Sequence, residues 1–270
     1  MRLPRTSRLA QQVLVVEGPP VKNLVMHVYP KRDPGHWRRA VRHVRARLSQ
    51  FDGRRLVSVA VDTSTERAAD VCREFGGEVE IREVWNDGTQ EMVSFPWLMQ
   101  QVIDDSDDLT FYCHAKGCTH TTNPSSHLWC DAMVSACLDY PALVDHVMAK
   151  KSICGAFRSR QQVGTSLASF HFAGTFWWVR NRELWSRDWR THDPEFWGAE
   201  SYPGIHFQPH ESACLFYDRA ETAHLYHIDW WRASVCPAYR SWRAEFNRRG
   251  IRPLADDPCL LWPEFRDWTR

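Results

Sequence analysis

The sequence lacks a long hydrophobic run. No stretch of its 270 residues approaches the roughly 20 apolar residues that a membrane-spanning helix needs. The apolar run at positions 13–16 is also too short to be the core of a secretory signal. The nine cysteines are odd in number and form no C-x-x-C pair, so the pattern does not indicate a disulfide framework. These absences predict a cytoplasmic protein with reduced thiols and no membrane span.

A large charge of one sign is missing as well. The net charge is +1, which argues against a strongly basic protein that binds nucleic acid. The charges are nevertheless unevenly placed, because residues 1–55 carry 13 Lys and Arg against 3 Asp and Glu, whereas residues 56–110 carry 3 against 13. The two stretches attract each other if they pack side by side. Two solvated faces would explain this pattern, and so would a positive mouth for an anionic ligand.

The length fits one large domain, or one domain with an appendage. Hydrophobic residues make up 43% of the chain and charged residues 25%, which is the range of globular proteins and excludes a disordered chain. The first 20 residues end in Gly-Pro-Pro and resemble a loosely held arm. We therefore expect an N-terminal arm over residues 1–21, a domain over 22–230, and a C-terminal helix and tail over 231–270 packed on it.

Apolar runs alternate with helical patterns over the first 113 residues. Strand-like runs occur at 23–29, 56–61, 79–85 and 109–113, and helical spacing lies between them at 33–51, 64–75 and 91–103. This alternation predicts an α/β fold of Rossmann-like type, with a mostly parallel sheet and flanking helices. The C-terminal part is expected to be rich in loops, over 188–212 in particular. It should also hold a helix at 127–150 that breaks near Pro141, and strands at 153–157, 169–180 and 223–228.

Ligands of such sheets bind beyond the carboxyl ends of the strands. His114 and Lys116 lie two residues apart at the end of the fourth predicted strand, so strand alternation projects them the same way. Gly117 follows them and permits a tight turn. A lysine charge, a histidine donor and backbone N–H groups together suit a phosphate. The alternative is a plain strand end with an exposed lysine.

Two metal-like patterns near this strand carry less weight. The set Cys113, His114, Cys118 and His120 has no common zinc spacing, and its first two members point to opposite faces of a strand. Residues 104–108 offer a D-x-D, the metal-nucleotide motif of many sugar transferases, but they precede the fourth strand instead of following it. We interpret this acidic run as a solvated turn at the other end of the sheet.

The second half of the chain offers aromatic and acidic candidates. Residues 174–178 form an aromatic strand, one face of which could stack on a sugar unless both faces are buried. Glu200 lies in a segment rich in Trp and Gly, and carboxyl groups in apolar surroundings suit general-base catalysis. It could equally make a structural hydrogen bond. A cluster of histidines with a carboxylate can hold a divalent metal, and here the cluster comprises His206, His210, Glu211, His224 and His227.

Taken together, these motifs resemble a bacterial group of glycosyltransferase-like proteins of the GT-A type. Its members share an N-x-x-x-x-E sequence before an apolar helix, then F-Y-x-H-x-K-G, W-x-x-x-M, G-T-F-W-W and W-G-x-E-S-Y-P. In this chain the motifs begin at Asn86, Phe111, Trp129, Gly174 and Trp197. The resemblance extends over about residues 22–230.

The resemblance implies a nucleoside-diphosphate sugar as donor and a carbohydrate acceptor, with a role in polysaccharide synthesis as the group-level expectation. It places the nucleotide or sugar near Asp62, Asn86 and Glu91, and the diphosphate near His114, Lys116 and Gly117. Glu200 would be the catalytic base, and the acceptor would contact Thr175, Trp177, Trp178 and Tyr202.

The chain departs from the pattern of GT-A enzymes in one respect. No acidic pair follows the fourth strand, so a requirement for Mn²⁺ or Mg²⁺ stays open, and Lys116 and His114 could neutralise the diphosphate instead. Two other functions also stay open. One is a non-catalytic module that binds a nucleotide or a carbohydrate, and the other is a metal-dependent hydrolase that uses the histidine-rich segment at 206–227.

Overall fold

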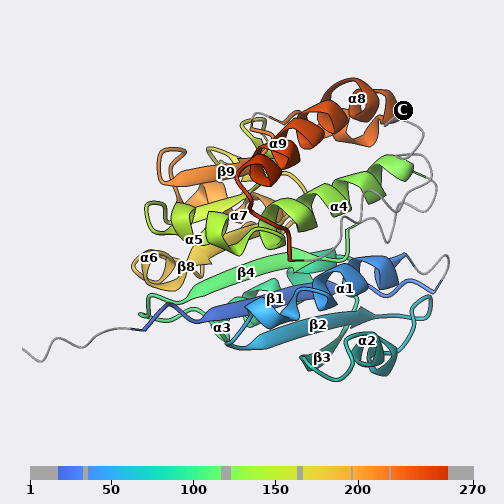
Figure 1. Ribbon diagram of the computed structural model, residues 1–270. Helices are drawn as coiled ribbons and strands as arrows, with labels where there is room; N and C mark the ends of the chain where they lie inside the picture. The colour runs from blue at the N-terminus through green and yellow to red at the C-terminus, as the bar shows by residue number, and fades with distance from the viewer. Residues whose placement is uncertain are drawn as a thin grey trace, which may run out of the picture.

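A seven-stranded sheet forms the centre of the protein (Figure 1). The computed structural model describes residues 18–32, 36–116, 123–162, 167–195, 197–218 and 220–254. The strand order is β3-β2-β1-β4-β8-β5-β9. In chain order these strands are β1 (Lys22–Val28), β2 (Arg55–Val61), β3 (Glu80–Trp85), β4 (Leu109–His114), β5 (Ile153–Ala156), β8 (Trp177–Arg180) and β9 (Ser212–Phe216). Two short strands, β6 (Arg158–Ser159) and β7 (His171–Phe172), pair separately.

The strand directions confirm the predicted α/β class with a mostly parallel sheet. β1 to β4 are mutually parallel, β8 runs antiparallel to both of its neighbours, and β9 is again parallel to β5. The chain builds outward from β1 to β2 and β3, and then returns to place β4 on the other side of β1. The order of the strands therefore reverses between β1 and β4, and such a switch point opens a crevice at the carboxyl ends of the strands.

Helices cover both faces of this sheet. One apolar core includes residues of α1, α2, α4, α5 and α9, and the other includes residues of α3, α6 and α7. None of the described helices is long and apolar enough to cross a membrane. The helices are α1 (Trp37–Arg45), α2 (Ala68–Glu74), α3 (Phe95–Gln100), α4 (Pro124–Leu138), α5 (Pro141–Met148), α6 (Asn181–Trp185), α7 (Gly198–His206), α8 (Ile228–Trp230) and α9 (Cys236–Arg248), with short turns at η1 (Leu48–Gln50), η2 (Gln90–Val93), η3 (Thr222–Tyr226) and η4 (Trp231–Val235).

The opposite charges of the first two stretches meet in the folded chain. Arg38 and Arg42 of α1 pair with Glu66 and Glu74, on and beside α2. Arg54, just before β2, pairs with Glu80 of β3. The predicted attraction between residues 1–55 and 56–110 is thus realised as ion pairs at the surface, where each one contributes little to stability.

Two strands predicted for the C-terminal half differ from those observed. The strand expected over 169–180 is split into β7 and β8, because the backbone turns at Gly174 and Thr175 with φ of +89° and +65°. The strand expected over 223–228 is wrong, because these residues form the 3-10 turn η3 and the start of α8. The apolar spacing there serves to bury Leu225 beside Trp231, whose indole N–H donates to the Leu225 carbonyl at 2.8 Å.

The interpretation of 188–212 as loops misses α7. Gly198, Pro203 and Gly204 are poor helix formers, yet each lies in this helix. A Cβ atom on Gly204 would lie 1.8 Å from the carbonyl oxygen of Phe170, so only glycine allows the helix to approach that backbone. Tertiary packing has therefore overridden local propensity in this segment.

The C-terminal helix begins earlier than the predicted boundary at residue 230. Helical structure is continuous from Ile228 to Arg248, through α8, the π-helical turn η4, and α9. Trp242 of α9 lies 5.5 Å from Phe216 of β9, measured between ring centroids, so this helix packs on the edge of the sheet. Residues 1–17 of the predicted arm and 255–270 of the predicted tail lie outside the described residues.

A buried ion pair on the face covered by α1 and α4 gives a first prediction. The Arg47 guanidinium donates to Asp139 at 2.6 Å, and both side chains are buried. Asp139→Ala leaves the guanidinium without its counter-charge, so we expect the free energy of unfolding to fall by about 3–5 kcal/mol. Urea unfolding followed by circular dichroism measures this change.

Asp145→Ala is the matched control. Asp145 pairs with Lys22 at 2.6 Å, but half of its side chain is exposed, so its loss should cost less than about 1 kcal/mol. An equal loss of unfolding free energy in the two variants would mean that the buried Arg47–Asp139 pair is no more important for stability than the exposed Lys22–Asp145 pair.

Candidate active site

The carboxyl ends of β1, β2 and β3 carry one polar cluster. Asp62, just after β2, accepts hydrogen bonds from the Tyr29 hydroxyl at 2.7 Å and from the Asn86 amide at 2.8 Å. Its other carboxylate oxygen accepts from the backbone N–H and the hydroxyl of Ser64 at 2.8 and 2.7 Å. The sequence-predicted residues Asp62 and Asn86 are thus brought together in direct contact.

This cluster holds Asp62 as a carboxylate. Burial acts to raise the pKa of the carboxyl, but the hydrogen bonds from Asn86, Ser64 and Tyr29 together outweigh it and hold the pKa well below its usual range. The Asn86 side chain is fixed from both ends, since its carbonyl oxygen also accepts from the Gly88 N–H at 3.2 Å. The result is a rigid polar surface at the carboxyl ends of these strands.

A second cluster lies at the switch point between β1 and β4. His114 ends β4, and its Nδ1 contacts the Glu91 carboxylate of η2. The other Glu91 oxygen accepts from the Tyr112 hydroxyl at 3.4 Å. His27 is the partner of His114 in the β1–β4 register, and its Nδ1 lies 3.0 Å from the Ser94 hydroxyl. Glu91 and His114, predicted separately from the sequence, thus form a single ion pair.

Lys116 lies beyond the end of β4, and its backbone N–H donates to the His114 carbonyl at 2.8 Å. Its ammonium is 4.1 Å from the Trp129 ring centroid on α4 and 5.8 Å from that of Tyr226 on η3. β4 ends at His114, so the strand alternation on which the prediction rested does not extend to Lys116. His114 contacts Glu91 of η2, whereas Lys116 lies over Trp129 of α4. Gly117 lies outside the described residues.

Glu200 reaches the same edge of the sheet from the first turn of α7. Its carboxylate accepts from the Gly174 N–H at 3.0 Å and lies 3.8 Å from Nε2 of His171. A Cβ atom on Gly174 would lie 3.2 Å from the Trp129 ring. Since Lys116 lies over that same ring, Gly174 and Trp129 connect the general-base candidate to the diphosphate candidate.

The aromatic strand is part of the core. Trp177 and Trp178 are both fully buried. Trp177 stacks on Tyr112 with ring centroids 5.2 Å apart, and the Trp178 indole donates to the Cys137 carbonyl at 2.9 Å. Of the two alternatives that the sequence left open, burial of both faces is the one observed. These rings are therefore unable to stack on an acceptor sugar.

The other two predicted acceptor contacts are buried as well. Tyr202 of α7 donates its hydroxyl proton to the Trp189 carbonyl at 2.5 Å, and its ring packs on Phe95 at 4.8 Å. Thr175 is 2% exposed and holds the turn between β7 and β8. Neither residue therefore presents a surface to an acceptor sugar.

The described residues do not fit a metal held by protein ligands alone. Among them, no three His, Cys, Asp or Glu side chains gather closely enough to hold an ion. In the histidine-rich segment, Glu211 pairs with Arg187, and His206 bonds to the Thr191 carbonyl at 2.8 Å. Cys113 is buried in the core, away from His114, and Cys118 and His120 lie outside the described residues.

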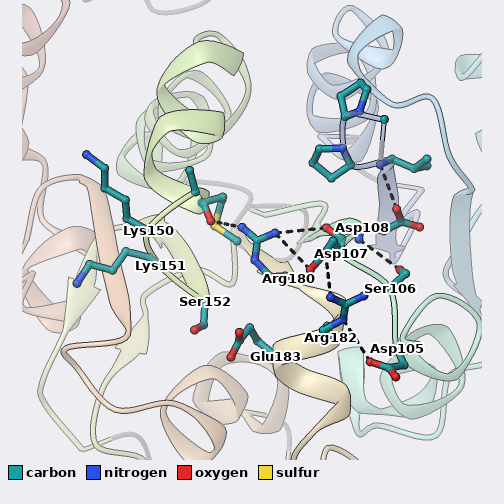
Figure 2. Close-up of a pocket in the computed structure, with 16 residues that line it drawn as sticks. Asp105, Ser106, Asp107, Asp108, Lys150, Lys151, Ser152, Arg180, Arg182 and Glu183 are labelled. Carbon is teal, nitrogen blue, oxygen red and sulfur yellow. Dashed lines mark hydrogen bonds and ion pairs between the residues drawn. The ribbon is translucent and has the colours of Figure 1, made fainter. Parts of the chain in front are cut away.

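The acidic run at 104–108 lies at the opposite edge of the sheet, as predicted. It borders an open cavity of about 1130 Å³ beside the amino ends of the parallel strands (Figure 2). Figure 2 shows Arg180 and Arg182 directed toward Asp107 and Asp105, whereas Lys150 and Lys151 project away from them. Asp105 and Asp107 thus form ion pairs with arginines, and they lie at the end of the sheet opposite to His114.

Comparison with known proteins gives weak structural similarities, among them two to solved structures. No family model matches the chain, and no curated protein matches it. A protein from Desulfovibrio desulfuricans G20, provisionally assigned as a nucleotide-diphospho-sugar transferase, aligns with 86% of this chain and 99% of its own at 10% identity and a TM-score of 0.42. 4-Diphosphocytidyl-2C-methyl-D-erythritol synthase aligns with 81% of this chain and 99% of its own at 11% identity and a TM-score of 0.38. Both TM-scores are below 0.5, so neither similarity carries an argument about function.

Sequence reasoning assigned no individual role to several residues of the site, namely His27, Tyr29, Ser94, Tyr112, Trp129 and His171. His27 left a signal as a polar residue inside the apolar run of β1. Tyr112 and Trp129 lie within the F-Y-x-H-x-K-G and W-x-x-x-M motifs. The others join the site through contacts between elements distant in sequence, such as the 3.1 Å contact of His171 with the Thr222 hydroxyl. The spacing of residues along the sequence cannot predict such contacts.

Burial of His27 couples folding to pH, which gives a second prediction. Burial lowers the pKa of His27 from 6.5 to about 4. The unfolded chain takes up this proton below pH 6.5 and the folded chain only near pH 4. The free energy of unfolding should therefore fall through that window by on the order of 3 kcal/mol. Urea unfolding at several pH values measures the slope.

His27→Gln should reduce this slope without abolishing it. His127 contributes in the same direction, because burial also lowers its pKa to about 4. A slope identical in His27→Gln and the unaltered protein would contradict the assignment of a neutral, buried His27.

Proposed function

We propose that the protein is a glycosyltransferase that moves a sugar from a nucleoside-diphosphate sugar to a carbohydrate acceptor. The observation that carries this proposal is the gathering of Lys116 and Glu200 around Trp129 and Gly174, next to the switch point of the sheet. A cation for a diphosphate and a carboxylate for an acceptor proton are the two groups that such a transfer needs.

The donor is expected to lie along the carboxyl ends of β1 to β4. Asp62 and Asn86, fixed by their mutual hydrogen bond, present polar atoms to the nucleoside. Lys116 and His114, at the end of β4, face the diphosphate. In the absence of an acidic pair after β4, these two side chains supply the positive charge that stabilises the leaving group.

The transfer is a single displacement at the anomeric carbon. The acceptor hydroxyl gives its proton to the Glu200 carboxylate while its oxygen bonds to the anomeric carbon of the donor sugar. The bond between that carbon and the phosphate oxygen breaks, and its electron pair stays on the diphosphate. The products are the glycosylated acceptor, the nucleoside diphosphate, and a proton that Glu200 releases to water.

The acceptor contacts differ from those that the sequence indicated. Because Trp177, Trp178 and Tyr202 are buried, we assign the aromatic surface for the acceptor to Tyr226. Its ring is half-buried and lies 5.8 Å from the Lys116 ammonium. Aromatic rings at the edge of a site stack on the apolar faces of sugars.

Calorimetric titration of the purified protein with UDP, GDP, CDP and dTDP, each with and without Mn²⁺, tests this proposal. Micromolar binding of one nucleotide is the expected result, and it names the donor class. Binding without hydrolysis of the matching donor sugar would favour the non-catalytic module. Failure of all four nucleotides to bind under both conditions would overturn the proposal.

A further inference from the structure

Glu91 and His114 form an ion pair, and both carboxylate oxygens of Glu91 and one ring nitrogen of His114 already have partners within the protein. One carboxylate oxygen of Glu91 contacts Nδ1 of His114, and the other accepts from the Tyr112 hydroxyl at 3.4 Å. Glu91 is only 8% exposed as a residue. Both of its carboxylate oxygens already have protein partners, so we do not assign Glu91 the direct contact with a donor sugar that the sequence resemblance implied.

The pair carries charge although it is buried. Burial by itself raises the pKa of the Glu91 carboxyl, but the nearby His114, His27 and Lys116 outweigh burial and bring the pKa below its usual range. Glu91 is therefore ionised at neutral pH and needs a cation beside it. His27 is neutral there, because burial lowers its pKa to about 4. His114 and Lys116 are the other two basic side chains that act on this carboxylate.

Nε2 of His114 has no partner among the described residues. This nitrogen is buried and without a hydrogen bond, although the side chain as a whole keeps 16% of its surface exposed. A buried donor left unpaired costs about 1–3 kcal/mol. Since Glu91 occupies Nδ1, Nε2 is the atom of this ring that remains for a ligand.

Building on the function above, we propose that Glu91 is a positioning residue, which orients His114 through Nδ1 so that Nε2–H donates to the leaving diphosphate of the donor. As the bond between the anomeric carbon and the phosphate oxygen breaks, its electron pair moves onto that oxygen. The Nε2 proton stabilises the resulting charge by a hydrogen bond, and Lys116 adds its charge. The acceptor proton goes to Glu200 as before, so the step needs no further reactant.

Histidine-selective ¹⁵N NMR titration of the protein tests the pair without any turnover. In the unaltered protein, the neutral His114 ring should carry its proton on Nδ1, and Nε2 should be the nitrogen that titrates. Glu91→Gln removes the carboxylate and destabilises the imidazolium, so His114 should lose its proton about one to three pH units lower. His114→Gln assigns the signal, and Glu80→Gln, which removes an exposed partner of Arg54, should leave it unchanged.

Addition of UDP, GDP, CDP and dTDP to the same samples tests the ligand. The nucleotide that binds should shift the Nε2 signal of His114, and the alkaline limb of the pH profile of kcat should move in Glu91→Gln by the same amount as the titration. An equal His114 titration in both proteins, or an Nε2-protonated neutral ring, would overturn the positioning role even if transfer is observed. If Glu91→Gln fails to fold, the ring nitrogen that carries the proton of neutral His114 in the unaltered protein tests the positioning role.

The two proposals fail in different ways. Binding of a nucleotide with an unmoved Nε2 signal would overturn this inference alone. Failure of every nucleotide to bind would overturn the proposed function and, with it, the contact between His114 and the diphosphate.

Discussion

Replacement of Lys116 by alanine should lower the rate of sugar transfer by about 10²–10³-fold, the loss that follows removal of one preorganised group from a developing negative charge. The ammonium is held over the Trp129 ring at 4.1 Å and next to the buried Glu91–His114 pair. It is therefore already in place before a diphosphate arrives. Transfer is measured with the donor that calorimetry identifies, by release of the nucleoside diphosphate.

Three further variants separate charge from packing. Lys116→Met keeps an apolar chain on the Trp129 ring and should lose as much activity as Lys116→Ala. Lys150→Ala removes a lysine at the opposite edge of the sheet and should leave the rate unchanged. Lys116→Arg retains the charge and should recover part of the rate. Full activity in Lys116→Ala with an unchanged melting temperature would remove Lys116 from the diphosphate site.

Glu200→Gln should lower transfer by about 10²–10⁴-fold while leaving donor binding intact, because loss of a general base affects the chemical step and not the nucleotide contacts. Glutamine has nearly the same shape, and its carbonyl oxygen can still accept from the Gly174 N–H that Glu200 binds at 3.0 Å. The measurements are kcat for transfer and calorimetry with the nucleotide.

Glu183→Gln is the matched control, since Glu183 borders the cavity at the other edge of the sheet (Figure 2). Loss of nucleotide binding in Glu200→Gln would show that Glu200 contacts the donor. A full rate of sugar transfer in Glu200→Gln would mean that another group is the base. His171, which lies 3.8 Å from Glu200, would then be the next residue to substitute.

The sheet and the donor side of the site could be predicted from sequence because they depend on local patterns. Apolar runs and helical spacing alternate through the first 113 residues, and they place β1 to β4 within a few residues of their observed bounds. Since the carboxyl ends of parallel strands lie at the same end of a sheet, Asp62, Asn86 and His114 had to lie at that end. Their positions follow from chain direction alone.

The acceptor side could not be predicted in the same way. Alternation along β8 puts Trp177 and Trp178 on opposite faces, but it does not say whether a helix covers each face. Side chains of α3 and α7 cover Trp177, and Phe51 stacks on Trp178 at 5.5 Å between ring centroids. Burial of the two indoles is thus a property of distant segments. The same holds for α7, whose Gly204 packs on the Phe170 backbone.

The antiparallel direction of β8 has a consequence for how the site can change over time. Because β8 runs against β4, it begins where β4 ends, and it brings Gly174 to the edge at which His114 and Lys116 lie. The proposed donor contacts come from residues 29–116 of the chain, whereas the proposed base and acceptor contacts come from residues 171–226. A recombination event or a set of substitutions confined to the second segment would replace the acceptor side as a unit. Under the proposed function, acceptor preference can thereby diversify among descendants that keep a single donor.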